Sequence, residues 1–340
     1  MRLMMTGGRG FIGSALVRRL VKTTDWQLLD IDRETYAARP LPTAGERYQH
    51  IRADINDREK VGEALAAFRP HKIIHMAAET HVDRSIADAR AFIDSNINGT
   101  FNLLEEVRAY FNTLAPSDQA AFRFIQLSTD EVFGDASLSN KEAGVEPYNP
   151  SSPYAASKAA ADHLARAWAR TFGLPVLLSY CSNNYGPGQY PEKLIPLFIG
   201  RALKGLPLPV YGDGAQQRKW LHVDDHAQAL KRLIEAGEAG QSYCIAGADT
   251  LSNLELVRRL CRTLDQLRPV AGGYEALITH CADRPGHDVQ YAMTTNSAME
   301  ALGWKAKIDF EQGLTSTVQW YLENPESLTL PEVFDWSAQP

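Results

Sequence analysis

Cysteine is scarce in this sequence, and the few cysteines form no ligand pattern. Four occur in the 340 residues, widely scattered and without a C-x-x-C or Cys/His spacing: Cys181, Cys244, Cys261 and Cys281. Disulfide-stapled secreted domains and structural zinc sites both need closer, patterned cysteines. We therefore expect free, buried thiols in a reducing cytoplasm.

Long apolar runs, blocks of like charge and internal repeats are also absent. No run approaches the length of a membrane span, and no secretory leader is visible. The net charge of −6 and the pI near 5.9 disfavour a nucleic-acid partner. Hydrophobic residues still form 44% of the chain, enough for one large or two closely joined domains. We expect a soluble cytoplasmic protein with neither a membrane nor a nucleic-acid partner.

A glycine-rich loop follows the first apolar segment, residues 3–5. Gly8, Gly10 and Gly13 fit the pattern G-x-G-x-x-G, and Gly7, Gly10 and Gly13 fit the related G-x-x-G-x-x-G. Glycine permits the tight turn and lets backbone N–H groups approach a pyrophosphate. The spacing predicts a dinucleotide-binding strand, loop and helix.

The second strand-like segment, residues 27–32, ends in an acid. Asp32 stands at the distance from the glycines expected for a carboxylate on the adenosine ribose. It would repel a 2′-phosphate, which favours NAD over NADP. Arg33 is the counter-argument, because an arginine there can receive that phosphate.

Two adjacent carboxylates and a hydroxyl follow the apolar run 122–127: Thr129, Asp130 and Glu131. Open α/β sheets hold ligands at the carboxyl ends of their strands. Like charges at close range push one carboxyl pKa upward, so the pair suits acid and base chemistry at one carbon skeleton. Taken alone, the segment could be a solvated acidic turn.

A second pair, Tyr154 and Lys158, is spaced four residues apart in a helical pattern. The two side chains then share a helix face, so the ammonium can lower the phenol pKa and let it accept a proton. Alone, this would be a surface pair. Together with the glycine loop and the acidic pair, it predicts a catalytic site.

Strand-like and helical segments alternate along the first half of the chain, which predicts an α/β fold with a Rossmann-type doubly wound parallel sheet. From Asn183 the composition shifts toward Pro, Gly and Tyr. We expect an NAD-binding domain over 1–180 and a smaller mixed α/β substrate-binding domain over 181–340. A strand near 242–246 could rejoin the first sheet.

These motifs resemble the extended short-chain dehydrogenase/reductase superfamily and, within it, the dTDP-glucose 4,6-dehydratase family. The superfamily motifs are the glycine loop, the Tyr154/Lys158 pair and the string at 183–187. The strings typical of the dehydratases lie at 32–36, 77–85, 128–134, 191–197 and 282–288. The resemblance implies an NAD-dependent hydro-lyase acting on a nucleotide sugar, dTDP-glucose. Such an enzyme oxidises C4, eliminates water across C5 and C6, and reduces C6 with the same cofactor.

The resemblance also implies a role for each catalytic residue. Tyr154 would accept the C4 hydroxyl proton, with Lys158 lowering its pKa and binding the nicotinamide ribose. Thr129 would hydrogen-bond the same sugar oxygen. Glu131 would abstract the C5 proton, and Asp130, kept protonated, would give its proton to the departing C6 hydroxyl.

Binding residues and assembly follow from the same resemblance. The residues implied for NAD are Gly7, Gly10, Phe11, Ile12, Gly13, Asp32, Arg33, Glu34, Thr35, Asp54, Ile55, Met76, Ala77, Ala78, Glu79, Thr80, Ser95, Tyr154, Lys158 and Asn184. Those implied for the nucleotide sugar are Thr80, Thr129, Asn183, Lys193, Leu194, Pro209, Val210, Tyr211, Arg218, Asn253, Asp283, Arg284, Pro285, Gly286 and His287. Cationic and amide donors among them suit a pyrophosphate. Helices near 96–111 and 154–170 would pair across a two-fold axis in a homodimer.

Three positions depart from the family pattern. Arg9 stands where the loop usually has alanine, and its side chain lies either over the pyrophosphate or in solvent. Phe133 replaces a tyrosine and so loses a hydroxyl, and Tyr180 stands where the dehydratases often carry asparagine. These changes leave room for an altered base or sugar preference.

Several alternatives remain open. An NAD-dependent nucleotide-sugar 4-epimerase needs no acid and base at C5 and C6, so the acidic pair disfavours it, while a UDP- or CDP-sugar could replace dTDP-glucose. A noncatalytic dinucleotide sensor would be expected to lose the tyrosine or the lysine. Arg218 could be a surface residue, and Arg284 could pair with Asp283. His222 and His226 resemble a metal pair, but the start of a helix with acidic residues explains them better, and we expect no metal.

Overall fold

A seven-stranded parallel sheet forms the larger part of the molecule. The computed structural model describes residues 1–41, 47–136, 147–291 and 293–331. The strand order is β10-β6-β5-β4-β1-β2-β3, and every neighbouring pair is parallel. This arrangement confirms the predicted Rossmann-type α/β fold. The strands are β1 (Arg2–Thr6), β2 (Gln27–Asp32), β3 (Tyr48–Arg52), β4 (Lys72–His75), β5 (Arg123–Leu127), β6 (Val176–Cys181) and β10 (Ser242–Ile245).

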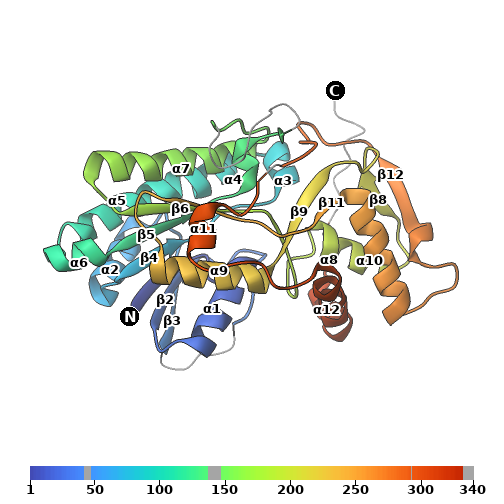
Figure 1. The fold of residues 1–340 in the computed structure, drawn as a ribbon, viewed down its shortest axis with the longest axis horizontal. Helices are drawn as coiled ribbons and strands as arrows, with labels where there is room; N and C mark the ends of the chain where they lie inside the picture. Colours follow the sequence, from blue (N-terminus) through green and yellow to red (C-terminus); the bar gives the residue numbers. More distant parts are fainter. Residues whose placement is uncertain (42–46, 137–146, 292, 332–340) are drawn as a thin grey trace.

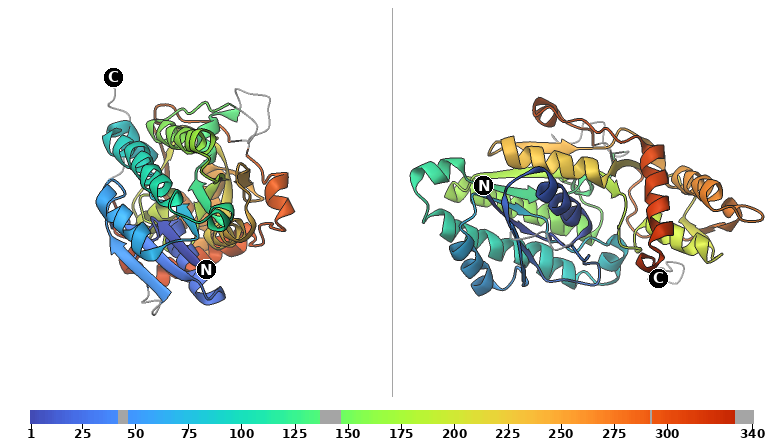
Figure 2. Two further views of the ribbon diagram at one scale, coloured as in Figure 1. Left: turned by 90° about the vertical axis from the view of Figure 1, so that its left-hand side faces the viewer. Right: turned by 90° about the horizontal axis from the view of Figure 1, so that it is seen from below.

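Helices cover both faces of this sheet, which is why its central strands are apolar along their length. β6 is buried at every residue, and β1 at all but its first. α2, α5 and α7 cover one face, and α1, α9 and α11 cover the other (Figure 1). Figure 2 shows α5 and α7 side by side along one outer face. The helices are α1 (Phe11–Thr23), α2 (Arg58–Phe68), α5 (Gly99–Phe111), α7 (Pro153–Phe172), α9 (Val223–Ala236) and α11 (Ser297–Ala301).

A smaller, mixed α/β part lies to one side of the sheet (Figure 1). It holds a three-stranded sheet of order β11-β9-β7, with one antiparallel and one parallel pair, and a parallel pair of β12 and β8. α8, α10 and α12 form its core with these strands. The elements are β7 (Asn183–Tyr185), α8 (Leu194–Leu203), β8 (Leu208–Tyr211), β9 (Gln217–His222), β11 (Thr250–Ser252), α10 (Asn253–Leu267), β12 (Ile278–Cys281) and α12 (Phe310–Glu323).

The chain returns to the large sheet after entering the smaller part. The strand expected near 242–246 is β10, which pairs with β6 at the sheet edge. α9 packs against α1 on the face of the same sheet. Residues 181–340 therefore contribute to both parts of the molecule.

Short helices complete the fold. They are α3 (Val82–Ala87), α4 (Arg90–Phe92), the π-helix η2 (Ile93–Asn98), α6 (Pro116–Ala121), and the 3₁₀ turns η3 (Asp130–Phe133), η5 (Tyr274–Leu277) and η6 (Pro325–Ser327). Within the described ranges, no helix is long and apolar enough to cross a membrane.

The glycine loop between β1 and α1 is held by close backbone contacts. Gly7 has a φ of +74°, and a Cβ there would lie 2.6 Å from the Ala77 nitrogen. A Cβ at Gly13 would lie 2.2 Å from the Gly7 carbonyl oxygen. Both positions therefore require glycine, and the loop brings α1 directly against the end of β1.

Candidate active site

A pocket opens at the carboxyl ends of the sheet strands and is bounded on its other side by residues of the segment 181–193. It brings together the predicted catalytic residues Thr129, Asp130, Glu131, Tyr154 and Lys158. Every residue predicted to bind the cofactor lines it except Glu34. The sheet thus places the dinucleotide loop and the acid–base residues in one cavity, as expected for an open α/β sheet.

The predicted sugar-binding residues divide into two groups. Thr80, Thr129, Asn183 and Lys193 line this pocket. The others lie outside its lining: Leu194, Pro209, Val210, Tyr211, Arg218, Asn253, Asp283, Arg284, Pro285, Gly286 and His287. Their charges still reach the site, because Arg218 and Arg284 both lower the pKa of Glu131.

Asp130 is held protonated at the end of β5. After this strand the chain turns into η3, where Thr129 caps the turn by accepting a hydrogen bond from the Glu131 N–H at 3.3 Å. Burial, and after it the negative charge of Glu131, raise the pKa of Asp130 to about 8. Burial therefore contributes more than the like-charge repulsion that the sequence suggested. A carboxyl with this pKa carries a proton at neutral pH.

Glu131 is surrounded by cations. Burial raises its pKa, but Arg284, Arg218 and Lys193 oppose this shift. Asp130 receives the additional negative field of Glu131. The two carboxyls therefore stand in different electrostatic surroundings, which favour the proton on Asp130.

Tyr154 and Lys158 lie on the first turns of α7. Ser152 caps this helix by accepting a hydrogen bond from the Ala155 N–H, and Pro153 occupies its first turn. The Lys158 ammonium donates to the Leu127 carbonyl oxygen at 2.7 Å. The helix start therefore fixes both side chains against the end of β5.

The sequence predicted that Lys158 lowers the pKa of Tyr154. This prediction is wrong for the chain alone, in which the pKa of Tyr154 is raised. Burial raises the pKa of Tyr154 well above its ordinary value, and the charge of Glu131 raises it further. A hydrogen bond from Thr129 acts in the opposite direction. Burial also lowers the pKa of Lys158. Spacing on a helix thus predicted which groups meet but missed the cost of removing both from water.

The adenosine side of the pocket favours an unphosphorylated ribose. Asp32 accepts hydrogen bonds from the N–H groups of Arg9 at 3.0 Å and Glu34 at 2.7 Å. The Arg33 guanidinium binds Asp54 at 3.2 Å and also pairs with Glu79. Asp54 and Glu79 already pair with Arg33, and Asp32 precedes it in the chain. A 2′-phosphate would therefore meet mainly negative charge.

Arg9, the first departure from the family pattern, pairs with Glu34. Its Nη1 lies 3.1 Å from the Glu34 carboxylate. The cation therefore has a partner within the chain. The cradle formed by Gly7 and Gly13, together with the acids at the end of β2, fits a dinucleotide such as NAD.

Asn96 lies outside the pocket lining but supports residues of the site, and the sequence reasoning missed it. It lies in the π-helix η2, where its amide donates to the Glu79 carbonyl oxygen at 3.0 Å and to Ser157 Oγ at 2.8 Å. Its Oδ1 accepts from the Glu79 N–H at 2.8 Å. Asn96 therefore ties the loop after β4 to α7. The available signal was a polar asparagine inside a helical pattern. The pattern did not show on which face it lies, because a π-helix does not follow the 3.6-residue period.

Glu192 is a second missed residue. Its carboxylate accepts from Tyr36 Oη at 3.0 Å and lies 3.2 Å from Arg84 Nε. The Arg84 guanidinium stacks over the Tyr36 ring at 4.2 Å. These contacts fasten the loop after β2 and the start of α3 to the smaller part across one side of the pocket.

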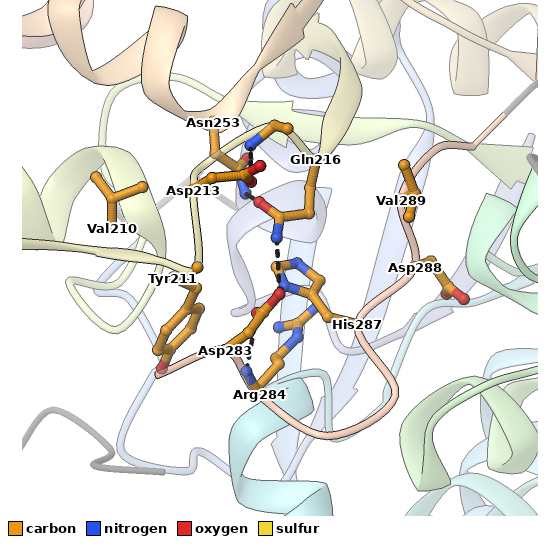
Figure 3. Close-up of polar contacts among 12 residues, drawn as sticks. Val210, Tyr211, Asp213, Gln216, Asn253, Asp283, Arg284, His287, Asp288 and Val289 are labelled. Carbon is orange, nitrogen blue, oxygen red and sulfur yellow. Dashed lines mark hydrogen bonds and ion pairs between the residues drawn. The ribbon is translucent and has the colours of Figure 1, made fainter. Parts of the chain in front are cut away.

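Asp283 organises the second group of predicted residues (Figure 3). Its carboxylate accepts from Gln216 Nε2 at 2.9 Å, contacts His287 Nδ1 at 2.6 Å and accepts from the Arg284 N–H at 2.8 Å. Asn253 donates to Gln216 at 3.4 Å. Residues from before β9, from α10 and from the loop after β12 therefore share one polar network.

For Arg218 and Arg284 the sequence left open two simpler interpretations, a surface position for Arg218 and an ion pair with Asp283 for Arg284. Arg218 is only 4% exposed, donates to the Asp288 carbonyl oxygen at 2.8 Å and stacks over Tyr291, so the surface interpretation is wrong. The Arg284 guanidinium lies 3.9 Å from Asp83 of α3. Arg284 thus spans from the smaller part to the larger one.

The two histidines belong to the start of α9. His222 caps this helix by accepting from the Asp224 N–H, and Asp224 and Asp225 occupy the first turn, as predicted. His226 is buried and contacts Asn184 Oδ1 through Nδ1 at 2.9 Å. Within the part of the chain that the structure describes, no group of His, Cys, Asp and Glu side chains could hold a metal ion.

Comparison with known proteins gives the same family from sequence and from structure. The family model for GDP-mannose 4,6 dehydratase matches residues 4–317. A probable dTDP-glucose 4,6-dehydratase from Sinorhizobium fredii is 51% identical over 95% of this chain and 93% of its own. The dTDP-glucose 4,6-dehydratase of Neisseria meningitidis is 48% identical over 95% and 94%.

Solved structures agree with this relationship. A dTDP-glucose 4,6-dehydratase from Streptomyces venezuelae with NAD bound has a TM-score of 0.85 at 40% identity, covering 96% of this chain and 98% of its own. A UDP-glucose 4-epimerase from Thermus thermophilus in complex with NAD has a TM-score of 0.81 at 28% identity, covering 95% and 99%. By its sequence, its fold and its pocket, the chain belongs to the dTDP-glucose 4,6-dehydratase family of the extended short-chain dehydrogenases/reductases.

Proposed function

We propose that this protein is an NAD-dependent hydro-lyase that converts dTDP-glucose to dTDP-4-keto-6-deoxyglucose and water. The observation that carries the proposal is the buried Asp130–Glu131 pair beside Tyr154 in the pocket that begins at the glycine loop. Interconversion of epimers at C4 needs no such acid and base. Elimination of water from neighbouring carbons needs both.

The first step removes a proton from the C4 hydroxyl. Tyr154 accepts it through its phenol oxygen, and Thr129 hydrogen-bonds the same sugar oxygen. When bound, NAD⁺ would take the hydride from C4 and, as NADH, return it to C6, and its positive ring would favour the ionised phenol. Lys158, on the same face of α7, holds the nicotinamide ribose. Burial and the charge of Glu131 keep Tyr154 protonated in the chain alone, and the positive nicotinamide ring would offset this when the cofactor is bound.

The second step removes water across C5 and C6. The C4 ketone acidifies the C5 hydrogen, which Glu131 abstracts as the base. Asp130 then donates its proton to the C6 hydroxyl, which leaves as water. A pKa of about 8 suits this task, because Asp130 is protonated at neutral pH yet gives up its proton readily.

Binding residues divide between the two parts of the molecule. The cofactor residues predicted from the sequence, on the loops after β1, β2 and β4, would hold NAD. The nucleotide sugar lies between this site and the Asp283 network, with Lys193, Arg218 and Arg284 supplying positive charge to its pyrophosphate. The smaller part, built from residues within 181–340, thus provides most of the nucleotide-sugar-binding residues.

The substrate assignment is tested with a panel of nucleotide sugars. Purified protein with NAD is incubated with dTDP-, UDP- and CDP-glucose, and the alkaline absorbance of a 4-keto-6-deoxy sugar is followed. We expect the absorbance to appear fastest with dTDP-glucose. A faster reaction with UDP- or CDP-glucose would reassign the base, and a C4 epimer that keeps its C6 hydroxyl would contradict the dehydratase.

The division of labour is tested by Glu131→Gln and Tyr154→Phe, each serving as the control for the other. Glu131→Gln should permit C4 oxidation but slow product formation about 10²–10⁴-fold, because the C5 base is lost. The absorbance of reduced nicotinamide should then build up on the enzyme. Tyr154→Phe should suppress that absorbance itself. Normal turnover by Glu131→Gln would place the C5 base elsewhere.

Assembly as a homodimer is part of the proposal. Ile93, Phe101 and Phe172 are 47%, 40% and 43% exposed on the outer side formed by η2, α5 and α7. A second copy would cover this apolar face. Light scattering at micromolar concentration should report a dimer, and Phe101→Glu with Phe172→Glu a monomer. Leu267→Glu, an equally exposed apolar position on α10, should remain dimeric, and a monomeric unmodified protein would contradict the proposal.

A further inference from the structure

Asp162 is a fully buried carboxylate for which the steps above have no role. It lies on α7, one turn beyond Lys158, and has no exposed surface. It does not line the pocket. Burying an ionisable group is costly unless its charge is used or paired.

One oxygen of Asp162 reaches the end of β5. Oδ2 accepts hydrogen bonds from Ser128 Oγ and from Tyr148 Oη, the latter at 3.0 Å. Ser128 immediately precedes Thr129 and Asp130. The other oxygen, Oδ1, has no hydrogen-bond partner among the described residues. Asp162 therefore anchors the backbone that carries the acid–base pair and retains an acceptor that no neighbour uses.

Asp162 follows Lys158 by four residues on α7, and both side chains are buried, so they lie on one face of this helix. Burial lowers the pKa of Lys158, and the charge of Asp162 is the largest influence that raises it. Cys181 on β6 and His75 on β4 also face this lysine. Burial raises the pKa of the Cys181 thiol to about 12 and lowers the pKa of His75 to about 3, so both are neutral near pH 7. Among these neighbours, Asp162 alone supplies a negative charge.

The groups around Asp162 support its ionised form. Burial raises its pKa, while Lys158, the hydrogen bonds from Ser128 and Tyr148, and Arg166 lower it. The pKa of Asp162 stays above its usual value because burial is the largest influence, and its partners oppose that shift.

We propose that Asp162 is a positioning residue that keeps Lys158 charged and holds Ser128, so that one buried carboxylate links the oxidation and elimination halves of the site. The inference rests on the proposed function for its catalytic consequence. The charge state of Lys158, which the proposal predicts, can be measured without substrate turnover.

Tyr180, at which this chain departs from the family pattern, belongs to the hydrogen-bonded network around Asp162. Tyr148 Oη lies 2.6 Å from Tyr180 Oη, and Arg166 donates to Tyr180 Oη at 2.9 Å. Phe133 packs against both tyrosine rings, with centroid distances of 5.5 and 5.0 Å. Tyr180 thus reaches Asp162 through the hydrogen bonds of Tyr148, and Arg166, its other partner, also acts on the pKa of Asp162. Tyr180→Phe is a matched control, because it removes a buried hydroxyl of this network without touching Asp162.

The test is Asp162→Asn, which keeps an acceptor for Ser128 and Tyr148 but removes the charge. The Lys158 Nζ is followed by NMR of protein with labelled lysine. Without the carboxylate the ammonium should lose its proton at a pH about one unit lower or more. The alkaline limb of C4 oxidation should move to lower pH by the same amount, with roughly tenfold less oxidation at pH values above the new midpoint. Asp162→Glu should restore both, and Tyr180→Phe should change neither.

A milder variant keeps the proposal falsifiable if Asp162→Asn does not fold. Tyr148→Phe removes one hydrogen bond that favours ionised Asp162, so the Asp162 carboxyl, followed by NMR of protein with labelled aspartate, should take up its proton at higher pH. Because the two charges interact, the Lys158 Nζ signal should shift at that same pH. Unchanged Lys158 titration in Asp162→Asn, or a Lys158 signal in Tyr148→Phe that does not respond when the Asp162 carboxyl takes up its proton, would overturn the proposal. Asp162→Asn could shift the Lys158 titration while the unmodified protein shows no dehydratase activity. That result would refute the proposed function and support the role of Asp162.

Discussion

Burial of the Asp130–Glu131 pair is the constraint on which the rest of the site depends. Two carboxyls removed from water at the end of a parallel strand cannot both ionise freely, because each charge loses its hydration and repels the other. The protein meets this cost by protonating Asp130 and by directing Arg218, Arg284 and Lys193 at Glu131. All three cations come from the second half of the chain. The smaller part therefore completes the electrostatics of a site built on the larger sheet.

The framework that carries this pair is fixed by short polar bridges. Asn96 joins the loop after β4 to α7, Asp162 joins α7 to the end of β5, and Glu192 fastens the smaller part to the loop after β2. Each bridge connects segments that are far apart in the chain. Together they hold the cofactor loops, the Tyr154–Lys158 helix and the acid–base pair in one arrangement, as preorganised catalysis requires.

Local patterns were sufficient to predict the parallel sheet, the glycine loop and the meeting of Thr129, Tyr154 and Glu131, because strand ends and helix faces follow from chain periodicity. They could not predict burial. The high pKa of Tyr154 and the buried position of Arg218 depend on packing between distant segments. Asn96 was missed for a different reason, since a π-turn breaks the helical period. Roles of individual residues came from family resemblance and remain predictions.

The central claim is that oxidation at C4 and reduction at C6 belong to one cycle, with Glu131 exchanging a proton at C5 in between. The most direct test uses dTDP-glucose deuterated at C4, followed by mass spectrometry and proton NMR of the product. The account predicts deuterium at C6, no net consumption of NAD, and, for unlabelled substrate in heavy water, deuterium at C5. Label found at C4 in a product that keeps its C6 hydroxyl would contradict the account.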